Sequence, residues 1–163
     1  MVTHRKKCLK KNLNQKQVKL LAEKLSNVLK TGDTVFLSGP VGSGKTFFVR
    51  HLIQNFLKMK GVEVEEVPSP SYTLVQVYDS AIPTIWHIDL YRLSDSNEVV
   101  ELGLEDMFPS IIALVEWPER MGEKVPDRYL SINFCQGIFS MDERSLMFEF
   151  YGKNWEHLLK SKL

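Results

Sequence analysis

The chain has 163 residues, of which 44% are hydrophobic and 25% are charged, and this composition is typical of a globular protein rather than a disordered chain. A formal net charge of +1 excludes a protein whose overall field gathers nucleic acid, so contact with RNA would need a local patch or a partner protein. No apolar run has the length of a signal peptide or a membrane span, so we expect a cytoplasmic protein without membrane contact.

Basic residues crowd the amino end of the chain, at Arg5, Lys6, Lys7, Lys10 and Lys11. Short runs of like charge at a terminus are usually solvated, so this pattern predicts a mobile tail over residues 1–11. Contact of the tail with RNA or a partner is the alternative. The remaining residues, 12–163, contain no repeat and no linker, which predicts one domain.

The first predicted element is a helix, because Asn14 and Gln17 have the spacing of a capping box and apolar residues then recur at helical spacing up to Leu29. A short apolar strand at 34–38 and an amphipathic helix at 47–60 follow. Further strands are predicted at 62–67, 72–78, 84–90, 111–117, 129–134 and 146–151, and short helices at 98–102 and 155–162. This order predicts an α/β protein with a three-layer fold like that of P-loop NTPases, in which helices flank a central, mostly parallel sheet.

Between the 34–38 strand and the 47–60 helix lies a glycine-rich segment that matches the pattern G-x-x-x-x-G-K-[ST] at every specified position. Such a loop turns backbone N–H groups toward phosphates at the start of a helix, where the helix dipole also favours anions. The lysine reaches the β- and γ-phosphates, and the final hydroxyl ligates magnesium. The pattern therefore predicts a nucleoside triphosphate site at Gly39, Val41, Gly42, Ser43, Gly44, Lys45 and Thr46.

Glu116 ends the apolar strand predicted at 111–117, with Pro118 two positions later. A P-loop protein needs a carboxylate at the end of a neighbouring strand to help hold magnesium, so we expect Thr46 and Glu116 to share the metal. A solvated glutamate at a strand end is the alternative. Trp117 stands where many ATPases have a water-activating glutamate, so we expect slow hydrolysis by the isolated chain and either a nucleotide-covering or a packing role for the indole.

Two further segments supply candidate site residues. The sequence H-I-D-L-Y-R at 87–92 alternates as a strand does, which places Asp89 near a strand end, where it can accept a proton or order a magnesium-bound water. Arg92 can neutralise phosphate charge or pair with a carboxylate such as Asp89. The sequence P-S-P-S-Y-T at 68–73 predicts either a loop that γ-phosphate orders through Ser71 and Thr73 or a rigid connector.

Taken together, these motifs resemble those of the TsaE (YjeE) family over about residues 13–144. The resemblance rests on the Gly-Lys-Thr loop, the S-P-S-Y-T-L-V segment at 69–75, the H-I-D-L-Y-R-L segment at 87–93, E-L-G-L at 101–104 and V-E-W-P at 115–118. It implies a small ATPase that supports synthesis of threonylcarbamoyladenosine at position 37 of tRNA.

What this resemblance implies for the site is ATP at 41–46, magnesium at Thr46 and Glu116, and a catalytic or water-ordering role for Asp89. Trp117 and residues 71–73 would line the site, and Gln17 and Arg144 would lie near the nucleotide. The implied partners are the threonylcarbamoyl transferase TsaD and its paralogue TsaB, with tRNA reached only through that complex and the isolated chain a monomer or weak oligomer. A small-molecule kinase and a nucleotide-gated interaction module that does not hydrolyse ATP remain alternatives.

Overall fold

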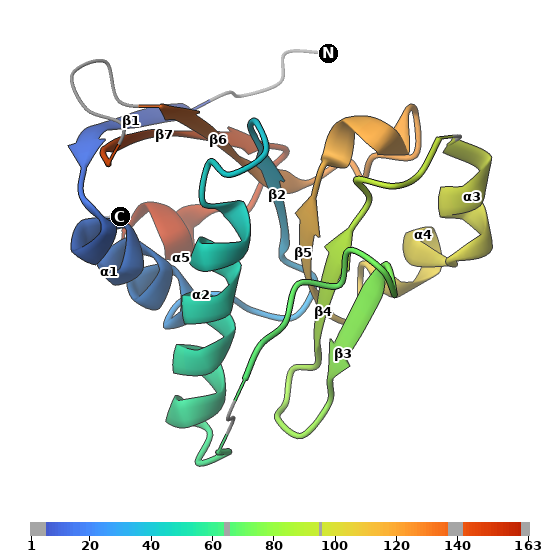
Figure 1. Cartoon of the computed structure of the whole chain (residues 1–163). Helices are drawn as coiled ribbons and strands as arrows, with labels where there is room; N and C mark the ends of the chain where they lie inside the picture. The colour runs from blue at the N-terminus through green and yellow to red at the C-terminus, as the bar shows by residue number, and fades with distance from the viewer. Residues whose placement is uncertain (1–5, 64–65, 95, 137–141, 161–163) are drawn as a thin grey trace.

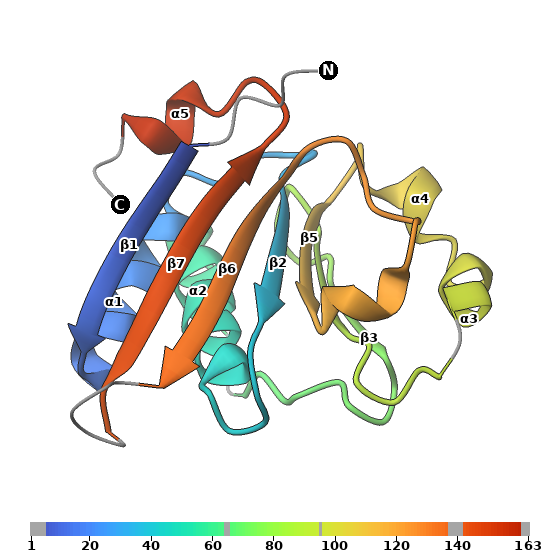
Figure 2. The same cartoon turned by 90° about the horizontal axis from the view of Figure 1, so that it is seen from above.

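The computed structural model describes residues 6–63, 66–94, 96–136 and 142–160. Its centre is one sheet of seven strands, which Figure 2 displays from above. Across the sheet the strands are β1 (Lys6–Leu13), β7 (Arg144–Tyr151), β6 (Tyr129–Gln136), β2 (Thr34–Ser38), β5 (Ile112–Glu116), β4 (Ile85–Asp89) and β3 (Val75–Tyr78).

Parallel pairing is confined to the middle of the sheet. Strand β2 lies between β5 and β6 and is parallel to both, and β4 is parallel to β5. The outer pairs, β3 with β4, β6 with β7 and β1 with β7, are antiparallel. The predicted α/β fold is confirmed, but the sheet is mixed and not mostly parallel, because antiparallel strands are added on either side of the parallel ones. The carboxyl ends of the parallel strands form one edge.

Helices cover both faces of the sheet (Figure 1). The helices α1 (Gln15–Ser26), α2 (Lys45–Met59) and α5 (Glu156–Leu159) contribute to one hydrophobic core, into which Val35 and Leu37 of β2 point. The other core receives Phe36 and packs against α3 (Ser96–Glu101), α4 (Leu104–Met107) and the 3₁₀ turn η1 (Pro118–Met121). Because neighbouring residues of β2 enter opposite cores, its three central residues are all apolar, as expected of a strand buried on both faces.

Helix α1 begins with the predicted capping box. The Asn14 side chain accepts a hydrogen bond from the Gln17 backbone N–H at 3.0 Å, and the Gln17 side chain accepts one from the Asn14 N–H at 2.9 Å. Such a cap contributes about 1 kcal/mol to helix stability. None of the described helices is long and apolar enough to cross a membrane.

Two predictions about local structure were wrong. Residues 6–11 of the predicted mobile tail belong to β1, which pairs with β7 at the edge of the sheet. Cys8 and Leu13 pack against the core, whereas Lys7 and Lys11 remain exposed, and exposed lysines on an edge strand discourage pairing with further chains.

The predicted strand at 62–67 is absent from the described part of that segment, which leaves out residues 64 and 65. Val62 and Val67 pack against the same core as α2. The apolar side chains of Val62 and Val67 therefore serve core packing.

Candidate functional site

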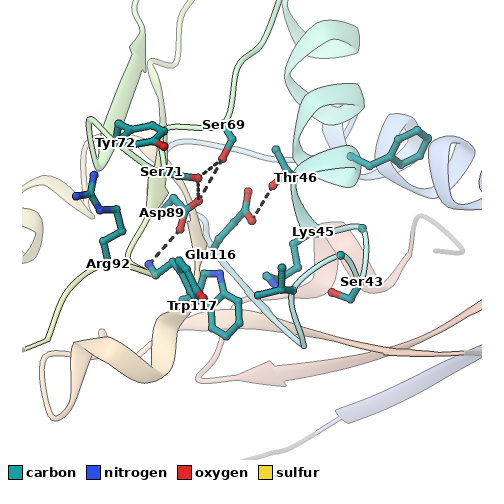
Figure 3. Close-up of a pocket in the computed structure, with 15 residues that line it drawn as sticks. Ser43, Lys45, Thr46, Ser69, Ser71, Tyr72, Asp89, Arg92, Glu116 and Trp117 are labelled. Carbon is teal, nitrogen blue, oxygen red and sulfur yellow. Dashed lines mark hydrogen bonds between the residues drawn. The ribbon is translucent and has the colours of Figure 1, made fainter.

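The glycine-rich loop connects the carboxyl end of β2 to the first residue of α2, at the edge where the parallel strands end (Figure 3). Gly44 is the N-cap of α2 and has φ of 102°, a conformation that residues with a Cβ rarely adopt. The loop thereby presents the N-terminus of a fifteen-residue helix, where unpaired N–H groups and the helix dipole attract anions.

Gly39 brings the loop into close contact with β6. Its φ is 140°, and a Cβ atom at this position would lie 2.6 Å from the carbonyl oxygen of Phe134 and 2.9 Å from the Phe134 Cβ. Both neighbours belong to a central strand and cannot move aside easily. Gly39 therefore sets the start of the loop by its lack of a side chain, without lining the cavity described below.

We expect Gly39→Ala to lower the free energy of unfolding by about 2 kcal/mol more than Gly61→Ala does, because overpacking adds to the strain of positive φ. Gly61 also has positive φ, at 73°, but a Cβ atom added there would have no neighbour within 4 Å. Chemical denaturation of both variants measures the difference. Equal losses of stability would show that the approach to Phe134 imposes no constraint.

Lys45 is buried, with 4% of its surface exposed, at the first position of α2. Its Nζ donates hydrogen bonds to the carbonyl oxygens of Gly39 at 2.6 Å and Pro40 at 3.0 Å. The ammonium also lies 4.0 Å from the centroid of the Trp117 ring. Burial lowers the pKa of Lys45, and the nearby carboxylates of Glu116, Glu119 and Asp89 oppose that shift. The site thus contains a desolvated cation, and an anion that reaches it interacts more strongly than it would in water.

Glu116 lies at the end of β5, and its two carboxylate oxygens contact different residues. Oε2 accepts a hydrogen bond from the Thr46 hydroxyl at 3.0 Å, while Oε1 lies 2.9 Å from Nε2 of His87. Glu116 is 2% exposed and His87 is fully buried. The alternative of a solvated glutamate at the strand end is therefore wrong. No role for His87 was predicted from the sequence.

Asp89, at the end of β4, is directly opposite Glu116 in the parallel register. Its Oδ2 accepts hydrogen bonds from Ser71 at 2.9 Å and Ser69 at 3.2 Å, and its Oδ1 accepts one from the Tyr91 backbone N–H at 3.1 Å. These contacts attach the 68–73 loop to the edge of the sheet. Ser69 joins the site although only Ser71 and Thr73 were predicted from this loop.

Trp117 follows Glu116 and has φ of 60°, an unfavourable conformation for a bulky residue that costs about 1–2 kcal/mol. Its ring packs 4.9 Å from that of Tyr91. Strain of this kind is characteristic of functional sites, where the surrounding structure holds it in place. Arg92 lies over the ring of Tyr72, at 5.1 Å, and not against Asp89, so the alternative of an Arg92–Asp89 pair is not formed.

These side chains surround a cavity of about 740 Å³, which Figure 3 shows in close-up. Most of the predicted site residues line it, but Gly39 and Thr73 do not, and Thr73 is exposed in the turn before β3. The described residues that line the cavity come from the glycine-rich loop, the first turn of α2, the 68–73 loop and the ends of β4 and β5: Val41, Gly42, Ser43, Gly44, Lys45, Thr46, Phe47, Ser69, Ser71, Tyr72, Asp89, Tyr91, Arg92, Glu116 and Trp117.

A second cavity, of about 470 Å³, shares Gly42, Ser43, Gly44 and Phe47 with the first and extends toward the start of α1. Arg144 lines it and donates a hydrogen bond from Nε to the Ser43 carbonyl at 3.0 Å. Gln17 is not among its lining residues, although Asn14, its partner in the capping box, is.

A Gly-Lys-Thr loop between a central parallel strand and a helix, with a carboxylate at the end of the adjacent strand, defines the P-loop NTPase-like class of α/β folds. Within this class, a family model described as threonylcarbamoyl adenosine biosynthesis protein TsaE matches residues 13–145. The chain therefore belongs to the TsaE family, as its motifs indicated, and the name of that family places it in the biosynthesis of threonylcarbamoyladenosine in tRNA.

Individual relatives agree with this assignment. The tRNA threonylcarbamoyladenosine biosynthesis protein TsaE of Rickettsia felis is 37% identical over 143 residues, which cover 82% of this chain and 81% of the relative. The protein of the same name from Bacillus subtilis is 30% identical over 149 residues, covering 91% and 89% of the two chains. The crystal structure of Bacillus subtilis YdiB superposes with a TM-score of 0.72 at 25% identity, covering 98% of this chain and 95% of that chain.

Proposed function

We propose that this chain binds ATP with Mg²⁺ in the cavity between the glycine-rich loop and the ends of β4 and β5, and hydrolyses it slowly when alone. The observation that carries the proposal is the contact of the Thr46 hydroxyl with Glu116 Oε2 at 3.0 Å, in a cavity that the buried Lys45 also lines. A cation-binding pair of oxygens and a phosphate-binding cation thus converge on the N-terminus of one helix.

The residues present fit a magnesium ion. Mg²⁺ prefers oxygen ligands, and in nucleotide sites it is held by one or two protein groups together with phosphates and water. Thr46 and Glu116 supply one neutral and one anionic oxygen, and both are fixed on regular secondary structure. When bound there, the ion would neutralise phosphate charge and orient the phosphates.

The protein groups have separate roles in this proposal. Backbone N–H groups of the loop and the Lys45 ammonium hold the phosphates, which requires Lys45 to exchange its carbonyl partners for phosphate oxygens. Asp89 orders water near the terminal phosphate and holds Ser69 and Ser71 of the loop beside it. The second cavity, beyond Gly42 and Ser43, accommodates the nucleoside.

The biological role that we propose is support of threonylcarbamoyl modification of adenosine at position 37 of tRNA, through nucleotide-dependent action on TsaD and TsaB. Family membership supports this role. Because the net charge is only +1, tRNA would be reached mainly through the protein partners. We place the chain in the cytoplasm, as a monomer or weak oligomer when it is alone.

Steady-state ATP hydrolysis by the purified chain, with and without TsaD and TsaB, tests this proposal. We expect slow turnover alone, faster turnover with both proteins, and co-elution of the three that depends on ATP and Mg²⁺. Nucleotide-dependent co-elution without hydrolysis in a single-turnover assay would favour the interaction module instead. Nucleotide binding without any response to TsaD and TsaB would contradict the proposed role.

A further inference from the structure

His87 is a fully buried residue of the sheet whose ring contacts Glu116. It lies in β4, opposite Leu114 of β5, two positions before the paired ends Asp89 and Glu116. Side chains two positions apart along a strand share a face, so the ring lies beneath the cavity on the same side of the sheet as both carboxylates. The diagonal step between the strands is short enough for an imidazole to reach Glu116.

The carboxylate of Glu116 is held from two sides. Thr46 contacts Oε2 at 3.0 Å, and Nε2 of His87 contacts Oε1 at 2.9 Å. An ionised carboxylate only accepts hydrogen bonds, so the contact requires a proton on Nε2 of His87. The two contacts together fix the rotation of the carboxylate and leave Oε2 directed toward the loop.

Packing alone does not account for a histidine at this position. The ring is fully buried, and its Nδ1 has no hydrogen-bond partner among the residues that the structure describes. A buried polar atom without a partner destabilises the fold, whereas leucine would fill the same apolar surroundings without that cost. What the histidine supplies that leucine cannot is the Nε2–H donor to Glu116.

We infer that His87 is a positioning residue for magnesium binding. Its Nε2–H holds Oε1 of Glu116, so that Oε2 of the same carboxylate stays directed toward the metal position beside Thr46. This inference rests on the proposed function, since it assumes that Thr46 and Glu116 ligate Mg²⁺. Carboxylate ligands are themselves commonly held by hydrogen bonds, and loss of such an outer partner typically weakens metal affinity about 10–100-fold.

The test compares His87→Leu with His87→Gln, whose amide nitrogen can take the place of Nε2. ADP binding is measured calorimetrically with saturating Mg²⁺ and again in excess chelator. The ratio of the two affinities measures how much Mg²⁺ strengthens ADP binding. We expect His87→Leu to reduce this ratio about 10–100-fold relative to the unmodified chain. We expect His87→Gln to recover most of that loss, with metal-free ADP affinity similar in all three proteins.

His157→Leu is the matched control. His157 Nε2 contacts Asp33 Oδ2 at 3.0 Å, which is the same kind of pair at the opposite end of β2 and away from the cavity. Its loss should lower the unfolding temperature and leave the affinity ratio unchanged.

An unchanged ratio in His87→Leu, or equal ratios in His87→Leu and His87→Gln, would overturn the inference. If His87→Leu does not fold, His87→Asn replaces it, because its amide is one methylene too short to reach Glu116. Equal ratios in His87→Asn and His87→Gln would then count against the inference in the same way. Failure of the unmodified chain to bind ADP, or to bind it more tightly with Mg²⁺, would instead refute the proposed function itself.

Discussion

Lys45→Ala is expected to weaken ATP binding by about 100-fold, because a hydrogen bond to a charged group contributes roughly 1.5–3 kcal/mol and Lys45 would contact two phosphates in the proposed complex. The side chain is buried at the head of α2, so exposed lysines elsewhere cannot substitute for it. Isothermal titration with ATP and Mg²⁺ measures the loss. A thermal melt of the metal-free variant establishes that the fold persists.

Lys58→Ala provides the control, since Lys58 lies on the same helix but is exposed near its carboxyl end. It makes the same change in net charge and should leave ATP affinity within a factor of about two, because exposed charges far from a ligand are screened by salt. Similar affinities for the two variants would mean that the cavity beside Lys45 does not bind the triphosphate.

Glu116→Gln is expected to remove most of the strengthening of nucleotide binding by Mg²⁺, by about 100-fold or more, because it replaces the carboxylate that we propose as a direct ligand of the metal. Glutamine has the same shape, so its amide can still hydrogen-bond with Thr46 and His87 and preserve the packing around this buried position. The charge that attracts the metal is lost. Titration of ADP with Mg²⁺ and with chelator measures the effect.

Glu119→Gln is the matched control for charge. Glu119 is exposed on η1 and, like Glu116, acts electrostatically on Lys45, but it does not line the cavity. Its replacement should leave the metal dependence intact. Retention of full Mg²⁺ dependence by Glu116→Gln would rule out Glu116 as a metal ligand and refute the arrangement proposed for Thr46.

The centre of the fold and much of the site were predictable from local patterns. The strand at 34–38 is a short apolar run, and the following helix has apolar residues at helical spacing. The loop between them has a specific motif. Asp89 and Glu116 were each placed at a strand end, and parallel pairing of β4 with β5 brings those ends side by side. Here the local signal and the tertiary structure point to the same residues.

Other parts of the site depend on contacts that a single sequence does not display. The role of Ser69 arises because the 68–73 loop folds back onto Asp89, and the role of His87 depends on a diagonal contact between two strands. The clue that could have identified His87 was a polar residue at a buried position of an apolar strand.

Strand β1 was not predicted, because its sequence is rich in lysine. Four lysines among the eight residues of β1 resemble a solvated tail, yet at a sheet edge one side of the strand remains exposed. The segment is extended because it pairs with the backbone of β7, and this pairing is not encoded in an alternating apolar pattern of its own.

The order of strands across the sheet bears on how the protein is made. Val35 of β2 pairs with Leu114 on one side and Leu130 on the other, so the strand that carries the glycine-rich loop leaves the ribosome long before either neighbour is synthesised. Until β5 and β6 are synthesised, β2 has no neighbouring strand to pair with, and its apolar side chains are not buried. Such late, non-local pairing slows folding and leaves apolar segments exposed to aggregation. We therefore expect the nascent chain to bind chaperones until β6 has been synthesised.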